Sequence, residues 1–155
     1  MSSKNTVMKF KNYSVEKITY LKNDFYKSDE ESVGFPKIAI RIIRDSNNKN
    51  KFNMILGAKY DQESNFPYLL EVVLRGFFET MNELETDNSK LDCVLANGSA
   101  IMYPYIRAVF TEMTSKSDYN PVILPTVNFY EYVKELHEKS EDFLMDSKYY
   151  KEYED

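Results

Sequence analysis

Several residue types are scarce in this sequence of 155 residues, and each scarcity excludes a class of protein. Cys93 is the only cysteine, so no disulfide can form within the chain, and this favours a reducing compartment. One cysteine and one histidine, His137, cannot supply a closed metal site. The four glycines are isolated, so the sequence has neither a phosphate-binding loop nor a nucleophile elbow. No cofactor is expected.

Catalysis is also disfavoured. A cysteine nucleophile would need Cys93 to meet His137, and no signature surrounds either residue. The adjacent carboxylates Glu141 and Asp142 are typical of a solvated helix face. We therefore interpret the chain as a non-enzyme.

Long hydrophobic runs are missing too. Nothing approaches the 18 or so apolar residues of a membrane-spanning helix, and the N-terminus has no apolar signal segment. These features predict a cytoplasmic protein with no membrane insertion.

Positive charge is not concentrated anywhere. The formal net charge is −5, and residues 128–155 alone hold nine acidic and four basic residues, so the first 127 residues hold 16 of each. A neutral body without a basic stripe argues against a nucleic-acid partner. We expect a single domain over residues 1–147 and an acidic, disordered C-terminal tail over residues 148–155.

Four segments in the first half alternate as strands do. They cover residues 7–21, 37–45, 51–61 and 68–81, and the polar loop between the second and third predicts a hairpin. The first alternates irregularly, which predicts a bulge. Because helical patterns follow only after these strands, the sequence predicts an α+β fold: a four-stranded antiparallel sheet followed by two helices packed on one face.

The first helix carries a proline. An apolar stripe at helical spacing predicts the helix, and its members are Met102, Ile106, Val109, Phe110 and Met113. Pro104 is accommodated if the regular helix begins near Tyr103; otherwise it kinks a helix that begins near Ser99. Asn128 is a natural N-cap for the last helix, which carries apolar residues as far as Phe143 and Leu144.

Between the helices lies an apolar, proline-bracketed connection, "PVILP", which we call the crossover (residues 121–125). Two prolines allow no regular element there. One interpretation is that the crossover packs across the first helix as ordinary core. The other is that it forms one wall of a groove for apolar peptide, so that aspartate at Ile123 or Leu124 weakens binding without unfolding the chain.

Two blocks of the chain resemble the SecB family of protein-export chaperones. They are "LLEVVLRGFF" (69–78) and "IMYPYIRAVFTEMTSK" (101–116) followed by "PVILPTVNF" (121–129), and the order of elements agrees over residues 8–137. The resemblance implies a homotetramer, built as a dimer of dimers through the first strand and first helix. It also implies an ATP-independent holdase that keeps unfolded preproteins in hydrophobic grooves and passes them to the motor SecA.

Carried onto this chain, the resemblance implies three sets of residues. The client groove is formed by Ile38, Ile40, Ile42, Tyr103, Phe110, Val122, Ile123 and Leu124. The oligomer interface includes Tyr105, Ile106, Val109 and Met113. Glu71 matches a fourth-strand carboxylate that contacts SecA, whereas Glu16 and Asp24 do not align with the first-strand carboxylate.

This departure leaves the partner open. The family also includes SecB-like chaperones that protect an antitoxin of a toxin–antitoxin pair, and this is the alternative function. A third hypothesis is a structural oligomeric adaptor whose groove is filled by its own side chains.

Overall fold

The computed structural model describes residues 8–27, 35–81, 88–116, 120–138 and 153–154. The elements are β1 (Met8–Lys22), β2 (Lys37–Asp45), β3 (Lys51–Tyr60), the 3₁₀ turn η1 (Gln62–Ser64), β4 (Tyr68–Thr80), α1 (Asn88–Thr114), α2 (Phe129–Glu138) and β5 (Tyr153–Glu154).

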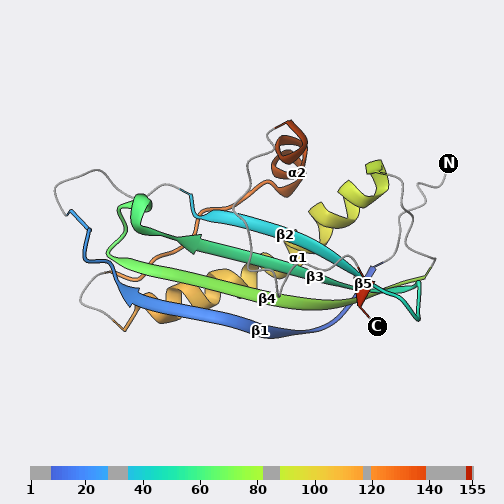
Figure 1. The fold of residues 1–155 in the computed structure, drawn as a ribbon, viewed down its shortest axis with the longest axis horizontal. Coiled ribbons are helices and arrows are strands. Elements are labelled where there is room, and N and C mark those ends of the chain that lie inside the picture. Colours follow the sequence, from blue (N-terminus) through green and yellow to red (C-terminus); the bar gives the residue numbers. More distant parts are fainter. Residues whose placement is uncertain (1–7, 28–34, 82–87, 117–119, 139–152, 155) are drawn as a thin grey trace.

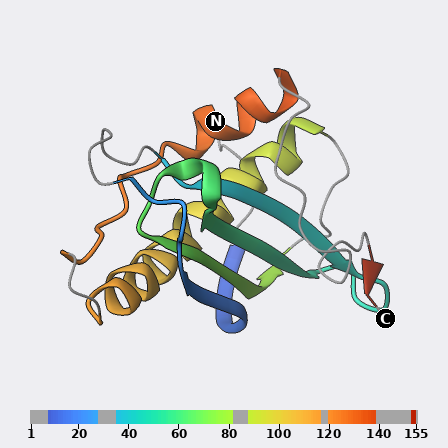
Figure 2. The same ribbon diagram turned by 60° about the vertical axis from the view of Figure 1, so that its left-hand side comes forward.

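The sheet has the order β1-β4-β3-β2-β5, and the first four strands pair antiparallel. Helix α1 crosses one face of the sheet, from the β2 edge to the β1 edge, and α2 packs against α1 beyond β2 (Figures 1 and 2). The predicted α+β arrangement of four antiparallel strands followed by two helices is therefore confirmed.

Strand alternation places the core between the sheet and α1. On β3, the side chains of Phe52, Met54, Leu56, Ala58 and Tyr60 all point into this layer, as their period of two predicts. A smaller cluster of Ile43, Ile55 and Val73 lies on the opposite face. One face of the sheet therefore carries most of the core, and the other carries mixed polar and apolar residues.

Local features of the strands follow from short-range chemistry. The irregular alternation of β1 corresponds to register shifts between Phe10 and Asn12 and between Val15 and Lys17, so the predicted bulge is confirmed. The β2–β3 hairpin is also confirmed. Its loop begins with Asp45, whose Oδ1 accepts hydrogen bonds from the backbone N–H groups of the residues two and three positions ahead, at 2.8 and 3.1 Å.

The predicted start of the first helix is wrong. Helix α1 begins at Asn88, so Pro104 lies well inside it rather than in its first turn. Its ring is exposed, where water can reach the carbonyl that loses its helical donor. The part of α1 before Ser99 packs closely against β3. At Gly98 there is no room for a larger residue, since a methyl group there would collide with the side chain of Met54.

Helix α2 begins as predicted. Asn128 Oδ1 accepts hydrogen bonds from the backbone N–H groups of Tyr130 and Glu131 at 3.1 and 3.3 Å, which is the N-cap geometry. The predicted continuation to Phe143 and Leu144 lies outside the described residues. Of the predicted acidic tail, the structure describes Tyr153 and Glu154, which form β5.

Candidate functional site

The crossover is hydrogen-bonded to α1 at two points. The Val122 N–H donates to Thr114 Oγ1, and Thr111 Oγ1 donates to the Val122 carbonyl, both at 2.8 Å. Further along, the Tyr103 hydroxyl donates to the Pro125 carbonyl at 2.6 Å. The crossover has no regular element, as predicted, yet side chains of α1 satisfy its backbone at both ends.

Because the crossover backbone is attached to α1, some of its side chains are buried and others are exposed. Successive residues of an extended chain point to opposite sides, and here Leu124 is 1% exposed whereas Ile123 is 73% exposed. Val122 is half-buried against the core. The expectation that Leu124 lies outside the core is therefore wrong, since the ordinary-core interpretation describes Leu124 but not Ile123.

The other predicted groove residues divide in the same way. Ile38, Ile40, Tyr103 and Phe110 are buried within the chain, and Ile42 is half-buried. The Tyr103 ring meets that of Phe129 edge-on, with centroids 5.3 Å apart, which joins α1 to α2. Of the eight predicted groove residues, the accessible ones in a single chain are Ile42, Val122 and Ile123.

Beside Ile42 lies a pocket of about 190 Å³. It is lined by Ile40, Arg41, Ile42, Arg44, Leu91 and Leu95. An apolar cavity of about 150 Å³ holds one benzene ring, so this pocket has room for an aromatic side chain. Its wall on α1 was not predicted. The signal was the spacing of Leu91 and Leu95, which continues the apolar helical stripe before Ser99.

Two side chains donate hydrogen bonds to backbone carbonyls of β2 beside this pocket. The Tyr132 hydroxyl donates to the Ile38 carbonyl at 2.5 Å, and Arg41 Nη1 donates to the Ile40 carbonyl at 2.7 Å. Both carbonyls belong to alternate residues, which in a strand direct their backbone groups to the same neighbour. These bonds therefore cover the edge of β2 that faces away from β3.

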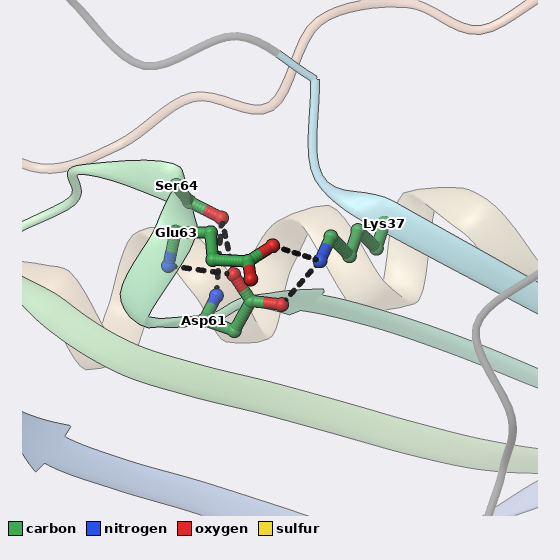
Figure 3. Close-up of polar contacts among 4 residues, drawn as sticks. All are labelled: Lys37, Asp61, Glu63 and Ser64. Carbon is green, nitrogen blue, oxygen red and sulfur yellow. Dashed lines mark hydrogen bonds and ion pairs between the residues drawn. The ribbon is translucent and has the colours of Figure 1, made fainter.

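The first residue of β2 is held by an ion-pair cluster (Figure 3). Lys37 Nζ lies 2.5 Å from Asp61 Oδ2 and 3.6 Å from Glu63 Oε2. The hydrogen bond to Asp61 raises the pKa of Lys37 above its ordinary value. Burial alone would raise the pKa of Asp61, but the hydrogen bond and charge of Lys37 lower it overall. Asp61 also accepts from the Glu63 N–H at 3.0 Å as the cap of η1.

Two neighbouring phenols, Tyr60 and Tyr103, are buried in the core. Burial, with a smaller contribution from Tyr103, raises the pKa of Tyr60 to about 12. Burial also raises the pKa of Tyr103 above its ordinary value, against the opposing charge of Arg107. Both hydroxyls therefore stay protonated near neutral pH, and Tyr103 remains a donor to the Pro125 carbonyl.

The predicted SecA contact, Glu71, is engaged in an ion pair on the outer sheet face. Lys17 Nζ lies 2.5 Å from Glu71 Oε1. Next to it, Arg75 Nε donates to Glu16 Oε1 at 2.6 Å. Opposite charges alternate across β1 and β4 here, so the carboxylates of this face are neutralised by neighbouring bases.

The predicted oligomer residues lie at the β1 side of α1. Tyr105 is exposed, and its ring centroid lies 4.5 Å from that of Tyr13 and 5.8 Å from that of Phe10. Exposed apolar residues continue along the same face of β1 at Val15 and Ile18, whereas the exposed Leu21, which pairs with Leu69, points to the opposite face of the sheet. Among the predicted interface residues, Val109 and Met113 are half-buried, whereas Ile106 is fully buried inside the chain.

The described part of the chain contains no cluster of three or more potential metal ligands. Cys93 is exposed, and the side chain of His137 lies outside the described residues. None of the helices within the described ranges is long and apolar enough to cross a membrane.

Four antiparallel strands, two helices on one face and an apolar connection attached to the longer helix define an α+β protein with an apolar surface beside a sheet edge. The family model for preprotein translocase subunit SecB matches residues 10–139, so the chain belongs to the SecB family. This family consists of non-enzymatic chaperones, in agreement with the interpretation drawn from Cys93 and His137.

One protein is similar to this chain in sequence, and two solved structures are similar to it in fold. An uncharacterized protein of Methanocaldococcus jannaschii is 32% identical over 124 residues, which cover 78% of this chain and 79% of that protein. The SecB-like chaperone of Mycobacterium tuberculosis, solved in complex with a peptide from the HigA1 antitoxin, has a TM-score of 0.60 at 13% identity and covers 77% of this chain and 90% of its own. A Streptococcus agalactiae protein of unknown function has a TM-score of 0.55 at 11% identity, covering 78% and 98%.

Proposed function

We propose that this chain is an ATP-independent cytoplasmic holdase that binds non-native polypeptides on the surface formed by β2, α1 and the crossover. The observation that carries this proposal is the exposed Ile123, which is held outward because Val122 is hydrogen-bonded to α1 and Leu124 is buried in the core. An apolar side chain presented from an anchored backbone is a preformed contact, so binding costs little ordering of the protein.

Affinity on such a surface comes from several weak contacts. A large side chain that becomes fully buried contributes about 1.5–3 kcal/mol. The pocket beside Ile42 has room for one ring, and Ile123 offers a second contact on the crossover. Contacts linked by one guest chain reinforce each other, which gives retention without strict sequence specificity.

The test is suppression of aggregation of reduced, denatured lysozyme at equimolar ratio. Ile123→Asp should reduce suppression several-fold, because a charge then replaces the exposed apolar contact. Met81→Asp is the matched control, since Met81 is 74% exposed and lies at the end of β4, away from the crossover. Absence of suppression by the wild-type chain, with its assembly intact, would overturn the proposal.

The outer face of the sheet bears on two possible fates of the client, export through SecA and protection of an antitoxin. Export requires handover to SecA, and the proposed contact Glu71 is paired with Lys17. This pairing favours the second candidate, a chaperone dedicated to the antitoxin of a toxin–antitoxin system, as does the antitoxin peptide bound to the M. tuberculosis protein of the same fold. A pulldown with purified SecA, compared with one using an antitoxin encoded beside the chaperone, separates the two.

Assembly as a dimer of dimers would begin at β1 and α1. An outer strand that carries exposed Val15 and Ile18 on one face is a surface that monomeric proteins normally avoid. Tyr105 extends this surface onto α1, whereas the buried Ile106 supports it from within. Light scattering of the wild type and of Ile18→Glu tests the assignment, with a lower mass expected for the variant.

A further inference from the structure

The outer edge of β2 is only partly paired. Strand β5 runs parallel to β2 and pairs Tyr153 with Arg44 and Glu154 with Asp45. Within the described ranges, positions 37–43 of β2 pair with β3 on one side and with no strand on the other. Strand β5 is far from β2 in the sequence, and among the described residues it is the one segment that pairs with this edge of β2.

Side chains bond two carbonyls in the rest of this edge. The Ile38 carbonyl accepts from Tyr132, and the Ile40 carbonyl accepts from Arg41. Covering an edge in this way hinders unwanted strand pairing, but each bond can be exchanged for a backbone N–H of an added strand. Two carbonyls of the edge are therefore satisfied by side chains, and an added strand could take over both bonds.

The surroundings of the edge suit a segment with aromatic and acidic residues. The pocket beside it has room for a ring and is bordered by Arg41 and Arg44. A strand in the register of β5, extended toward its N-terminus, runs past Ile42 and Ile40 and hence past this pocket. The tail sequence over 148–155, KYYKEYED, contains three tyrosines and three acidic residues.

We propose that the outer edge of β2 is a strand-addition site, that the C-terminal strand β5 occupies its end in the absence of a guest, and that a client displaces β5. The competition with clients rests on the function proposed above, whereas occupation of the edge by β5 does not. The segment is thus a built-in competitor that sets the affinity threshold for clients.

Strand β5 makes few contacts with β2, but its covalent linkage gives it a high effective concentration at the edge. A two-residue ladder holds few hydrogen bonds, so a client with a longer strand can replace it. Covalent linkage nevertheless gives such a segment an effective concentration on the order of millimolar. The apparent dissociation constant of a client equals its intrinsic value divided by the fraction of open edges, so an edge open about a third of the time weakens binding about threefold.

The experiment uses the full-length chain with Tyr153→Pro and Glu154→Pro together, because proline has no N–H to donate to β2. The matched control is Tyr153→Ala with Glu154→Ala, which keeps both N–H groups. The two probes are a fluorescein-labelled peptide of residues 148–155 and reduced, denatured lysozyme. Fluorescence anisotropy measures the binding of each probe, and hydrogen exchange of the β2 amides around Arg44 reports the pairing directly.

The proline variant should bind the peptide and the lysozyme at least about threefold more tightly than the wild type, with faster exchange near Arg44. The alanine control should lie closer to the wild type. Equal peptide affinity for the wild type and the proline variant would overturn the assignment of the edge. Enhanced peptide binding with unchanged lysozyme binding would overturn the competition alone. Capture of lysozyme by neither protein, with the peptide still bound by the proline variant, would instead refute the holdase function.

Discussion

Replacing the neighbouring residues Leu124 and Ile123 with alanine, one at a time, separates the stability of the crossover from its function. Leu124 is 1% exposed and packs in the main core, whereas Ile123 is 73% exposed. The hydrogen bonds at Val122 and Pro125 fix the backbone on both sides of the pair. The surrounding chain therefore cannot rotate to exchange the two side chains.

The expected magnitudes differ by several-fold. Truncating a buried leucine to alanine costs about 2–5 kcal/mol, because the apolar contacts are lost and a cavity remains. Full burial of an isoleucine contributes about 1.5–3 kcal/mol. With roughly a quarter of its surface covered, Ile123 contributes about 0.5 kcal/mol. For a domain of this size about 1 kcal/mol changes Tm by about 2–4 °C, so we expect a decrease of about 10 °C for Leu124→Ala and about 1–2 °C for Ile123→Ala.

Urea unfolding at fixed protein concentration measures both effects, because any assembly makes the midpoint depend on concentration. The midpoint should fall strongly for Leu124→Ala with an unchanged m-value. Lysozyme capture should fall for Ile123→Ala while its midpoint stays near that of the wild type. Equal losses of stability for the two variants, or a larger loss for Ile123→Ala, would refute the alternation on which the site depends.

Three further predictions concern the supports of the site. Asn128→Ala should destabilise the chain by about 1 kcal/mol through loss of the α2 cap, whereas Asn128→Asp should retain most of the stability in urea unfolding; equal losses would contradict the capping role. Tyr103→Phe keeps the ring but removes the donor to the Pro125 carbonyl, so a loss of about 1 kcal/mol in the same assay is expected, and an unchanged midpoint would argue against this bond. Because the pKa of Asp61 is lowered in the folded chain, its contribution to stability is present above the ordinary aspartate pKa and is lost as the pH falls through the lower folded value. Lys37→Met should therefore flatten the acid limb of a stability–pH profile measured by thermal unfolding, and an identical limb would exclude the pair as its source.

The strands show what local patterns can predict. On β3 a period of two over ten residues places Phe52, Met54 and Leu56 on the core face, and any packing partner on that side satisfies the pattern. The cap at Asn128 and the hairpin loop at Asp45 depend on groups two or three residues away. Such features can be predicted because the interacting atoms are close in the sequence.

The helix start was predicted wrongly for the opposite reason. The cost of Pro104 inside a helix is a local quantity, and it placed the start near 99 or 103. Packing of the segment before Ser99 against β3, with Met54 beside Gly98, outweighs that cost. Tertiary contacts provide most of the stability of helices in proteins, so a local penalty at one position is not decisive.

By itself, the sequence determined the class of fold and the apolar character of the crossover, because these depend on composition, periodicity and residues close along the chain. The family followed from the resemblance of two sequence blocks to SecB proteins. Only the tertiary structure decided that Leu124 points inward and Ile123 outward, that Leu91 and Leu95 border a pocket with β2, and that Glu71 is paired with Lys17. Each of these facts depends on atoms that are distant in sequence and are brought together by packing. No periodicity along the chain encodes which of two apolar neighbours will face the core.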